Sequence, residues 1–528
     1  MKKIINCKKS IVFVCALFLS VSCQDFLQDE LLSDTSVDFV LNTPEGLESG
    51  VVALYNLERN IYEKGQNEWM ISLILQNRTD LVIPRAGAGS LIGRYIWGEE
   101  VADFGTSARV GVIWRHFYRI VDRANAIIKA AEEIQDIDEG RRNQILGEAK
   151  CFRARAYFSL YRMFNNIFIK TEPTTPDNAF DRPQDKSSEA EIFALINSDL
   201  DFAIANLDMT TPQFGRYTQA AARHMRAKTA VWQQDWATAA SQAETVINDG
   251  NYSLVPNTKD VFAGDLNNSE TLHAIVYSDG EIGGGNRNLI HFNLVARYDK
   301  VPGAKYSLEN GNRSLGFLTL NDYLRNLLKE DPNDTRDDGT YYISYYTYND
   351  ADNLPAGVSL GDTIRIYDQF STDSGERNKY YERLNPGCLK FLDEAADPSS
   401  ATEISNIMIY RLAETYLIAA EAEMELGNTG AGLQYLNAVR NRAGAADATV
   451  LDEAAILDER ARELAFEGQR FYTLKRRGVF VSYVQDHGGN DNFRTEIRER
   501  VEPKHVNWPI DQNEIDLLGP NYPQNDGY

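Results

Sequence analysis

Cysteine is scarce in this chain of 528 residues, which contains only five. Three of them lie in or beside the N-terminal leader, so Cys151 and Cys388 are the only cysteines in the body. Two isolated cysteines cannot build a disulfide framework or a cysteine-ligated zinc site. The six histidines also lack a metal-ligand spacing such as HExxH. The sequence therefore predicts no metal and no cofactor.

Long hydrophobic runs are missing outside the first 22 residues. Residues 1–22 join a lysine-rich start, MKKIINCKKS, to the short apolar segment IVFVCALFLS, which is the pattern of a secretory signal peptide. Ser20 and Ser22 precede Cys23 in the manner of a bacterial lipoprotein cleavage box, so we expect Cys23 to be lipidated. The alternative is an ordinary leader that is cut nearby. The rest of the chain lacks the roughly 18 apolar residues of a membrane span, which leaves the lipid as the expected anchor.

Positive charge is in short supply. Lysine and arginine number 54 against 77 acidic residues, which gives a formal net charge of -23. A nucleic-acid partner needs a basic surface, so this balance argues against one. The same balance argues against docking on anionic lipid. Solubility alone accounts for such an acidic chain.

The clearest pattern is a helical hairpin in residues 407–477. Apolar residues recur there at helical spacing on both sides of Gly427, which separates two helical runs. Ala420 and Gly432 are small and twelve positions apart, so two helix backbones can approach closely at these points. This is the shape of a tetratricopeptide-type unit.

An earlier segment, residues 218–250, repeats the pattern. Ala227 and Ala239 are again twelve positions apart, and Asp235 and Trp236 occupy the turn between the helices. One helix pair cannot bury its own apolar face, so neighbouring pairs should stack. The apolar stripes are therefore expected to be core packing rather than ligand contacts.

We expect a mainly α fold, in which a tetratricopeptide-like helical scaffold carries one large irregular, loop-rich insertion. Residues 23–528 should form a single domain, with the scaffold at 40–250 and 406–480. The insertion, residues 252–405, holds 13 of the 27 tyrosines and shows little helical period. The tail, residues 481–528, is expected to lie over the surface because it ends in a segment rich in proline and glycine.

Two charged motifs have both a structural and a catalytic or metal-binding interpretation. Glu463 and Glu467 alternate with arginines at helical spacing in RARELAFEGQRFYTLKR, which favours an ion-pair network over the paired carboxylates of a glycosidase. The run DPNDTRDDG from Asp331 resembles part of a calcium loop. However, Tyr342 stands where the bidentate glutamate belongs, so no metal is expected there.

Eight segments, spread over nearly the whole chain, share the order and spacing of one known family. They are CQDFL from Cys23, WRHFYRIVDRANAII from Trp114, GEAKCFRARAYFSLYRMF from Gly147, TQAAARHMRAKTAVWQQDWATAASQAETVINDGNYSL from Thr218, YRLAETYLIAAEAEMELG from Tyr410, LNAVRNRAG from Leu436, RARELAFEGQRFYTLKRRG from Arg460 and WPIDQNEIDLL from Trp508. Together they resemble the SusD/RagB family of outer-membrane nutrient-binding lipoproteins of Bacteroidota.

The resemblance implies a function and a partner. It implies a helical fold with a ligand-binding insertion, lipid-anchored in the outer membrane and facing the exterior. It implies capture of glycans without catalysis, and a SusC-like TonB-dependent transporter that the lipoprotein covers as a lid and that powers import. Family members that handle peptides are known, so a peptide-binding import lipoprotein is the alternative. A secreted glycoside hydrolase is a further alternative, although the chain contains no recognisable catalytic motif.

A sugar site needs flat apolar faces for the rings and planar polar groups for the hydroxyls. Trp97 lies in a glycine-rich break in the helical pattern, residues 76–105, and is the expected platform. Asp80 and Arg85 of the same loop are the expected polar groups. The insertion is expected to contribute Tyr298, Tyr345, Tyr346 and Arg383. For each of these residues, the competing interpretation is packing or a local salt bridge.

Overall fold

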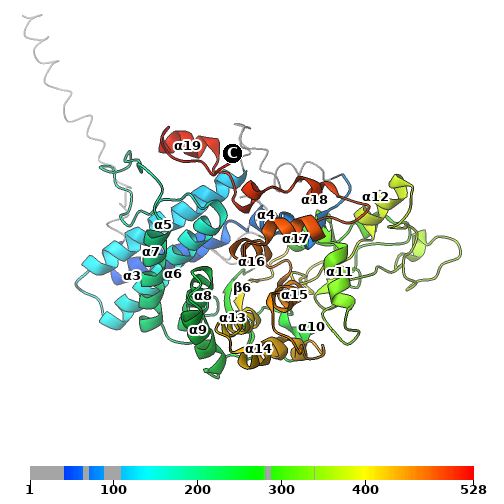
Figure 1. The fold of residues 1–528 in the computed structure, drawn as a ribbon, viewed down its shortest axis with the longest axis horizontal. Helices are drawn as coiled ribbons and strands as arrows, with labels where there is room; N and C mark the ends of the chain where they lie inside the picture. The colour runs from blue at the N-terminus through cyan, green and yellow to red at the C-terminus, as the bar shows by residue number, and fades with distance from the viewer. Residues whose placement is uncertain (1–40, 63–69, 88–108, 279, 281–286, 338) are drawn as a thin grey trace, which may run out of the picture.

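The computed structural model describes residues 41–62, 70–87, 109–278, 280, 287–337 and 339–528. Helical hairpins occupy one side of the molecule, and a less regular region with α11 (Asp322–Lys329) and α12 (Ser374–Arg383) occupies the other (Figure 1). The expected mainly α fold, with its helical scaffold and irregular insertion, is confirmed.

The first half of the scaffold is a set of long helices packed around an apolar core. They are α3 (Pro44–Arg59), α4 (Met70–Asn77), α5 (Arg109–Glu133), α6 (Glu139–Phe164) and α7 (Glu189–Asn206). Ser188 begins α7 with a capping box: its hydroxyl accepts from the Glu191 amide, and the Glu191 carboxylate accepts from the Ser188 amide at 2.8 Å. The core buries Trp114, Phe152 and Tyr157 among many aliphatic side chains.

The two predicted helix hairpins are both present. They are α8 (Gln219–Trp232) with α9 (Trp236–Asn248), and α13 (Leu412–Glu425) with α14 (Thr429–Arg442). Gly427 separates the second pair in the left-handed region, with a φ of 82°. A Cβ at Gly432 would lie 2.9 Å from the carbonyl oxygen of Ala420. The two helix backbones therefore approach closely at the pair of small residues, as the sequence predicted.

The hairpins stack on each other through alanine. Ala227 of α8 and Ala239 of α9 belong to one buried cluster that also contains Ile418 and Ala419 of α13. Because these side chains are small, the helices approach closely and exclude water along the whole contact. The stacking that the sequence required of these hairpins is therefore present.

The insertion contains short helices and strands that are mostly paired locally. They are α10 (Thr258–Val261), β2 (Thr271–Ile275), β3 (Leu318–Leu320), α11, β4 (Tyr342–Ile343), α12 and β5 (Gly387–Cys388). Three two-stranded antiparallel sheets result: β4 pairs with β5, β3 pairs with β1 (Val82–Pro84), and β2 pairs with β6 (Ile407–Arg411). Two of these sheets tie the insertion to the flanking segments.

Strand β6 corrects one expectation. The helical stretch was expected to start at residue 407, but residues 407–411 form a strand and the helix begins at Leu412. The segment IMIYR contains β-branched and aromatic side chains that favour a strand. Its hydrogen-bonding partner is β2, which lies more than 130 positions earlier in the chain. The spacing of apolar residues within one segment cannot reveal such a distant partner.

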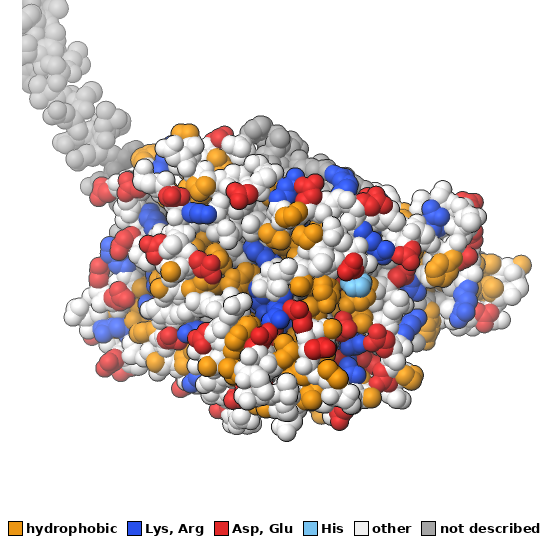
Figure 2. All heavy atoms as spheres, in the orientation of Figure 1, with side chains coloured by type: hydrophobic (Ala, Val, Ile, Leu, Met, Phe, Trp, Pro, Cys, Tyr) orange, Lys and Arg blue, Asp and Glu red, His pale blue; other side chains and the backbone are white. Residues whose placement is uncertain are grey.

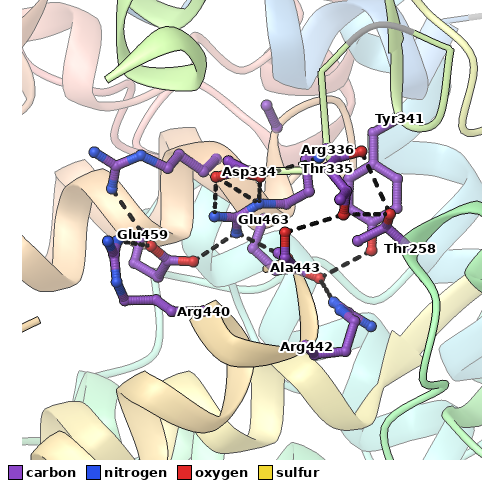
Figure 3. A network of polar contacts seen from close by, with 12 residues as sticks. Thr258, Asp334, Thr335, Arg336, Tyr341, Arg440, Arg442, Ala443, Glu459 and Glu463 are labelled. Carbon is purple, nitrogen blue, oxygen red and sulfur yellow. Dashed lines mark hydrogen bonds and ion pairs between the residues drawn. The ribbon is translucent and has the colours of Figure 1, made fainter. Parts of the chain in front are cut away.

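A buried group of charges joins the insertion to the last helices of the scaffold (Figure 3). We call it the ionic junction. It comprises Glu270, Asp334, Arg336, Arg411, Arg442, Glu459, Glu463 and Glu467. Glu463 contacts Arg336 at 3.0 Å and Arg411 at 2.6 Å, and it also contacts Arg442. The expected ion-pair network at Glu463 and Glu467 is confirmed.

After α14 the scaffold continues with α15 (Glu453–Leu464) and α16 (Arg470–Arg476). The tail, residues 481–528, was expected to lie over the surface, but it contains most of α17 (Phe480–His487), α18 (Glu496–Arg500) and α19 (Gln512–Leu518), and part of it is packed into the body. Trp508 is 0% exposed, its amide donates to the Met163 carbonyl at 2.9 Å, and the Arg78 guanidinium lies 3.6 Å from its ring centroid. Burial of the Trp508 ring removes a large apolar surface from water, and the free energy gained favours docking this part of the tail against the body.

On the face drawn in Figure 2, acidic and basic side chains are interspersed among scattered apolar groups. Among the residues that the structure describes, no helix is both long and apolar enough to cross a membrane.

Candidate functional site

The candidate site begins where strand β1 leaves its sheet. Pro84 lies opposite Leu318 of β3, and the next residue, Arg85, still donates its backbone N–H to the Phe317 carbonyl at 3.1 Å. Arg494 fixes this turn, because its guanidinium donates to the carbonyls of Pro84 at 3.0 Å and Arg85 at 2.6 Å. The Arg85 side chain is therefore presented at the edge of the insertion from a well-held backbone.

The Arg85 guanidinium lies over an aromatic ring and beside other charges. Its carbon is 5.3 Å from the Phe317 ring centroid, and its Nη1 donates to the Ala86 carbonyl at 2.9 Å. Burial lowers the pKa of Arg85, nearby Arg297 lowers it further, and Glu382 acts in the opposite direction. The backbone places these residues near one another: Gly316, next to Phe317, lies against Ala296, and the Arg297 amide donates to the Glu382 carbonyl at 2.9 Å.

The insertion supplies the rest of this surface. Arg297 donates to a Glu382 carboxylate oxygen at 3.3 Å, and each of these side chains is about a quarter exposed. Arg383 donates to the Tyr367 hydroxyl at 2.8 Å, with its guanidinium carbon 5.6 Å from that ring. We call the whole group the arginine surface. It comprises Arg85, Arg297, Phe317, Tyr367, Glu382 and Arg383.

The arginine surface combines two kinds of group that bind polar, ring-shaped ligands. The guanidiniums are planar and present several N–H donors in a fixed geometry. The rings of Phe317 and Tyr367 are half-buried and provide apolar faces beside those donors. Such a surface can hold a ligand that has both hydroxyl or acidic groups and a flat apolar face.

Asp80 does not reach this surface. It is 0% exposed, and its two carboxylate oxygens accept from Arg470 at 2.8 and 2.5 Å. Arg470 in turn donates to the Leu457 carbonyl at 2.7 Å. Asp80 is therefore a buried charge that anchors α16. Its contacts are those of a structural salt bridge, the alternative to ligand binding that the sequence left open.

The predicted tyrosines divide between core and surface. Tyr298 and Tyr346 are buried and stacked on each other, with ring centroids 5.1 Å apart. Their hydroxyls donate to the carbonyls of Asn312 and Asn385. Neither ring offers a face to solvent, so we do not retain these two as ligand candidates. Tyr345 is 49% exposed and remains a candidate.

Two of the predicted residues, Trp97 and Cys23, lie outside the residues that the structure describes. Their expected roles as sugar platform and lipidation site stay predictions. The structure adds four residues that sequence reasoning missed, namely Arg297, Phe317, Tyr367 and Glu382. No motif marks them, and only the tyrosine-rich composition of the insertion hinted at Tyr367.

A concavity with a volume of about 590 Å³ lies on the scaffold side, between α5, residues 165–188 and α19. Phe180 stands at its rim and is 92% exposed. Inside it, Tyr118 stacks on Phe168 at 4.5 Å, and Arg115 pairs with Glu514 at 2.5 Å. Of the residues predicted to bind a ligand, none that the structure describes lines this groove, so we retain the arginine surface as the candidate site.

The acidic loop from Asp331 is engaged with the protein itself. Asp331 accepts from the amides of Asn333 and Ala446, and Asp334 binds Arg336 through both carboxylate oxygens. Within the described residues, no group of three or more histidine, cysteine or acidic side chains is arranged to hold a metal ion.

Comparison with known protein families matches both halves of the chain. A family model described as "SusD family" matches residues 228–528. A second model, described as "Starch-binding associating with outer membrane", matches residues 26–230. The two matches meet near the end of α8 and together span almost the whole chain.

Individual proteins show the same likeness. "SusD-like protein P25" of Formosa agariphila is 26% identical over 534 aligned residues, covering 96% of both chains. A solved "Laminarin binding SusD-like protein" superimposes with a TM-score of 0.69 and 24% identity, over 92% of this chain and 99% of that one. "Surface glycan-binding protein A" from Bacteroides thetaiotaomicron gives 0.70 and 20%, over 92% and 99%. These two structures share the fold described above.

Proposed function

Because the chain belongs to the SusD family, we propose that it is a cell-surface glycan-binding lipoprotein that captures oligosaccharides for import. It delivers them to a SusC-like TonB-dependent transporter, which supplies the energy. The names of two proteins with the same fold, one binding laminarin and one a surface glycan-binding protein, support glycans as the ligand class.

The arginine surface is the observation that carries this proposal. Tyr367 and Phe317 place half-buried aromatic rings beside the guanidiniums, and Arg85, Arg297 and Arg383 offer paired donors for hydroxyl or acidic groups. The surface is held by backbone contacts from β1, β3 and Arg494, so little ordering is needed on binding. Trp97 remains the predicted additional platform.

The protein acts by binding and not by catalysis. The acidic side chains that a glycosidase interpretation would use, Glu463 and Glu467, are saturated by Arg411 and neighbouring cations. Glu382 at the arginine surface is itself bound by Arg297. A carrier that hands its ligand to a partner needs reversible affinity, which such a surface provides.

The anchor is a lipid on Cys23. The description of the family model over residues 26–230, which mentions the outer membrane, supports this location. A Cys23→Ala variant should fold normally but remain in the soluble fraction when cells lacking the transporter are fractionated. Continued recovery of the variant with the outer membrane would contradict the lipid anchor.

A binding panel tests the function. Calorimetry of residues 24–528 with neutral and charged oligosaccharides should show saturable binding to at least one glycan, without release of reducing ends. Arg85→Gln should weaken that binding about tenfold or more, since hydrogen bonds from charged groups contribute about 1.5–3 kcal/mol. Arg123→Gln, an exposed arginine on α5, is the matched control and should bind normally.

Three outcomes of the panel would point elsewhere. Binding of peptides instead of glycans would favour the peptide-import alternative. Sustained release of reducing ends, abolished by one carboxylate substitution, would favour a glycoside hydrolase. Unchanged binding in Arg85→Gln would move the site away from the arginine surface.

A further inference from the structure

Two of the three guanidiniums at the arginine surface, those of Arg297 and Arg383, share a single carboxylate. Arg297 lies 3.3 Å from one oxygen of Glu382, and the Arg383 Nε lies 4.0 Å from the other. Among the described residues, Glu382 is the one acid within 4 Å of any guanidinium nitrogen of Arg85, Arg297 or Arg383. The nearby Asp299 is occupied by Lys300 at 2.9 Å. The surface therefore carries an excess of positive charge.

The hydrogen-bond donors of these arginines are also incompletely used. The Nε of Arg85 and the Nε of Arg383 are buried and have no hydrogen-bond acceptor. The acceptors of their other nitrogens are neutral: the carbonyls of Ala86 and Lys300 and the hydroxyl of Tyr367. A guanidinium has five N–H donors and binds most strongly to a carboxylate, phosphate or sulfate that accepts two of them.

The ionic junction has the opposite ratio of arginines to carboxylates. Arg336 contacts Asp334, Glu459 and Glu463, and Arg411 contacts Glu270, Glu463 and Glu467. There, each guanidinium has several carboxylates around it. At the arginine surface, guanidiniums outnumber carboxylates instead. This local excess of positive charge occurs in a protein whose formal net charge is -23.

The aromatic rings hold the cations in place. Arg85 lies over Phe317, while Arg383 and Lys379 both lie within 5.7 Å of the Tyr367 ring centroid. The cation–π contacts position the guanidiniums beside the rings and partly desolvate them, which strengthens their attraction for an anion. A neutral ligand would occupy the same faces but would leave the excess charge uncompensated.

We propose, on the premise that the chain binds glycans at this surface, that its glycan carries an anionic substituent and that Arg85, Arg297 and Arg383 receive that group. The substituent is the carboxylate of a uronic acid or a sulfate ester. Both are flat or compact oxyanions that accept two parallel N–H bonds from one guanidinium. Glu382 bridges Arg297 and Arg383 in the free protein and competes with the incoming anion.

Matched pairs of oligosaccharides test the charge requirement. Oligogalacturonates are compared with their methyl esters, and sulfated galactan oligosaccharides with their desulfated forms, beside neutral glucans, by calorimetry in 50 mM NaCl. At least one charged glycan should bind tenfold or more tightly than its neutral counterpart. The advantage should shrink in 500 mM NaCl, because ions screen the exposed part of the attraction. The two pairs distinguish a carboxylate from a sulfate.

The outcomes separate this inference from the proposed function. If neutral glycans bind as tightly as the charged ones, or more tightly, the glycan-binding function stands and the anionic preference is overturned. If no glycan binds at all, the proposed function fails and this inference fails with it.

Substitutions around Glu382 give a sharper result. Arg297→Gln and Arg383→Gln should each lower the affinity for the charged glycan tenfold or more. The affinity for a neutral glycan should change much less. Glu382→Gln removes the competing carboxylate and should strengthen binding of the charged glycan several-fold. Replacing a residue that only supports the fold would weaken binding of both glycans. A gain of affinity for the charged glycan alone therefore identifies Glu382 as a competitor of the anionic group.

Arg377→Gln provides the control on the same helix, α12. Arg377 donates to the Ser371 carbonyl at 3.0 Å and lies outside the arginine surface, so its replacement should leave both affinities unchanged. Melting temperatures of all four variants establish that they are folded. A Glu382→Gln protein that melts normally and binds the charged glycan more weakly than wild type would overturn the assignment.

Discussion

Two contacts hold the same scaffold together by opposite means. Where α9 meets α13, the buried contact contains small and aliphatic side chains, including Ala239 and Ile418. Where the insertion meets α15, the contact is made of charge, with Glu463 in contact with three arginines. The stability of the first contact depends on how closely the helix backbones approach. The stability of the second depends on every buried charge having a partner of opposite charge.

The difference matters for the candidate site, because the ionic junction is connected to it through the insertion. The Tyr341 hydroxyl donates to Glu463 at 3.2 Å, and the next residue begins β4, which pairs with β5. Asn385, just before β5, donates to the Leu320 carbonyl at the end of β3. Strand β3 in turn pairs with β1, and Arg85 directly follows β1. The junction therefore supports the strands that present the arginine surface.

Removing one carboxylate should break the charged contact. In Glu463→Gln, the guanidiniums of Arg336, Arg411 and Arg442 lose a shared anion in a buried environment. We expect the free energy of unfolding to fall by about 3–5 kcal/mol, the range for breaking one partner of a buried ion pair. Urea denaturation followed by circular dichroism measures the change, and a loss below about 1 kcal/mol would contradict it.

The same residue predicts a pH dependence. Burial alone would raise the pKa of Glu463, but Arg442, Arg411 and Arg336 hold it well below its usual range. A carboxylate with a lowered pKa stabilises the fold above the unfolded value of about 4.3 and loses this contribution as the pH falls towards the folded value. The stability of the wild type should therefore drop more steeply below about pH 4.3 than that of Glu463→Gln.

Sequence reasoning succeeded for the alanine contact because its signal is local. The small residues at Ala227, Ala239, Ala420 and Gly432 repeat at helical spacing within single hairpins, and the structure brings them together as predicted. The irregular insertion was also recognised from the loss of that period. The strand at 407–411 was missed because its partner, β2, lies far away in the sequence.

The charged contact and the candidate site were only partly predictable. Glu463 was expected to form ion pairs, but its partner Arg336 lies 127 positions away, and spacing cannot identify such a partner. Arg85 and Arg383 do lie at one surface, whereas Tyr346 points into the core and its neighbour Tyr345 points out. Adjacent residues of an extended segment face opposite ways, and the sequence does not say which one faces the solvent.

A single methyl group should disturb the alanine-type contact. In Gly432→Ala on α14, the new Cβ would lie 2.9 Å from the Ala420 carbonyl oxygen and would also meet Leu451. We expect a loss of about 1–3 kcal/mol from overpacking. Gly430→Ala on the same helix is the control, since no atom lies within 4 Å of its new Cβ. It should be neutral or stabilising by about 0.5–1 kcal/mol, and equal effects of the two substitutions would contradict the close crossing.

The smallest effect is expected where a charge pair lies on the surface of the apolar part of the scaffold. Asp201 of α7 is 59% exposed and pairs with Arg226 of α8 at 3.1 Å. Because the Asp201 carboxylate is itself largely solvated, its attraction for Arg226 is screened, and the loss in Asp201→Asn should stay below about 1 kcal/mol. In 1 M NaCl, where the screening length falls to about 3 Å, this loss should vanish, while the loss in Glu463→Gln should persist because ions do not enter the junction. If both losses disappeared in salt, the ionic junction would be accessible to solvent, and burial would not be what distinguishes the two contacts.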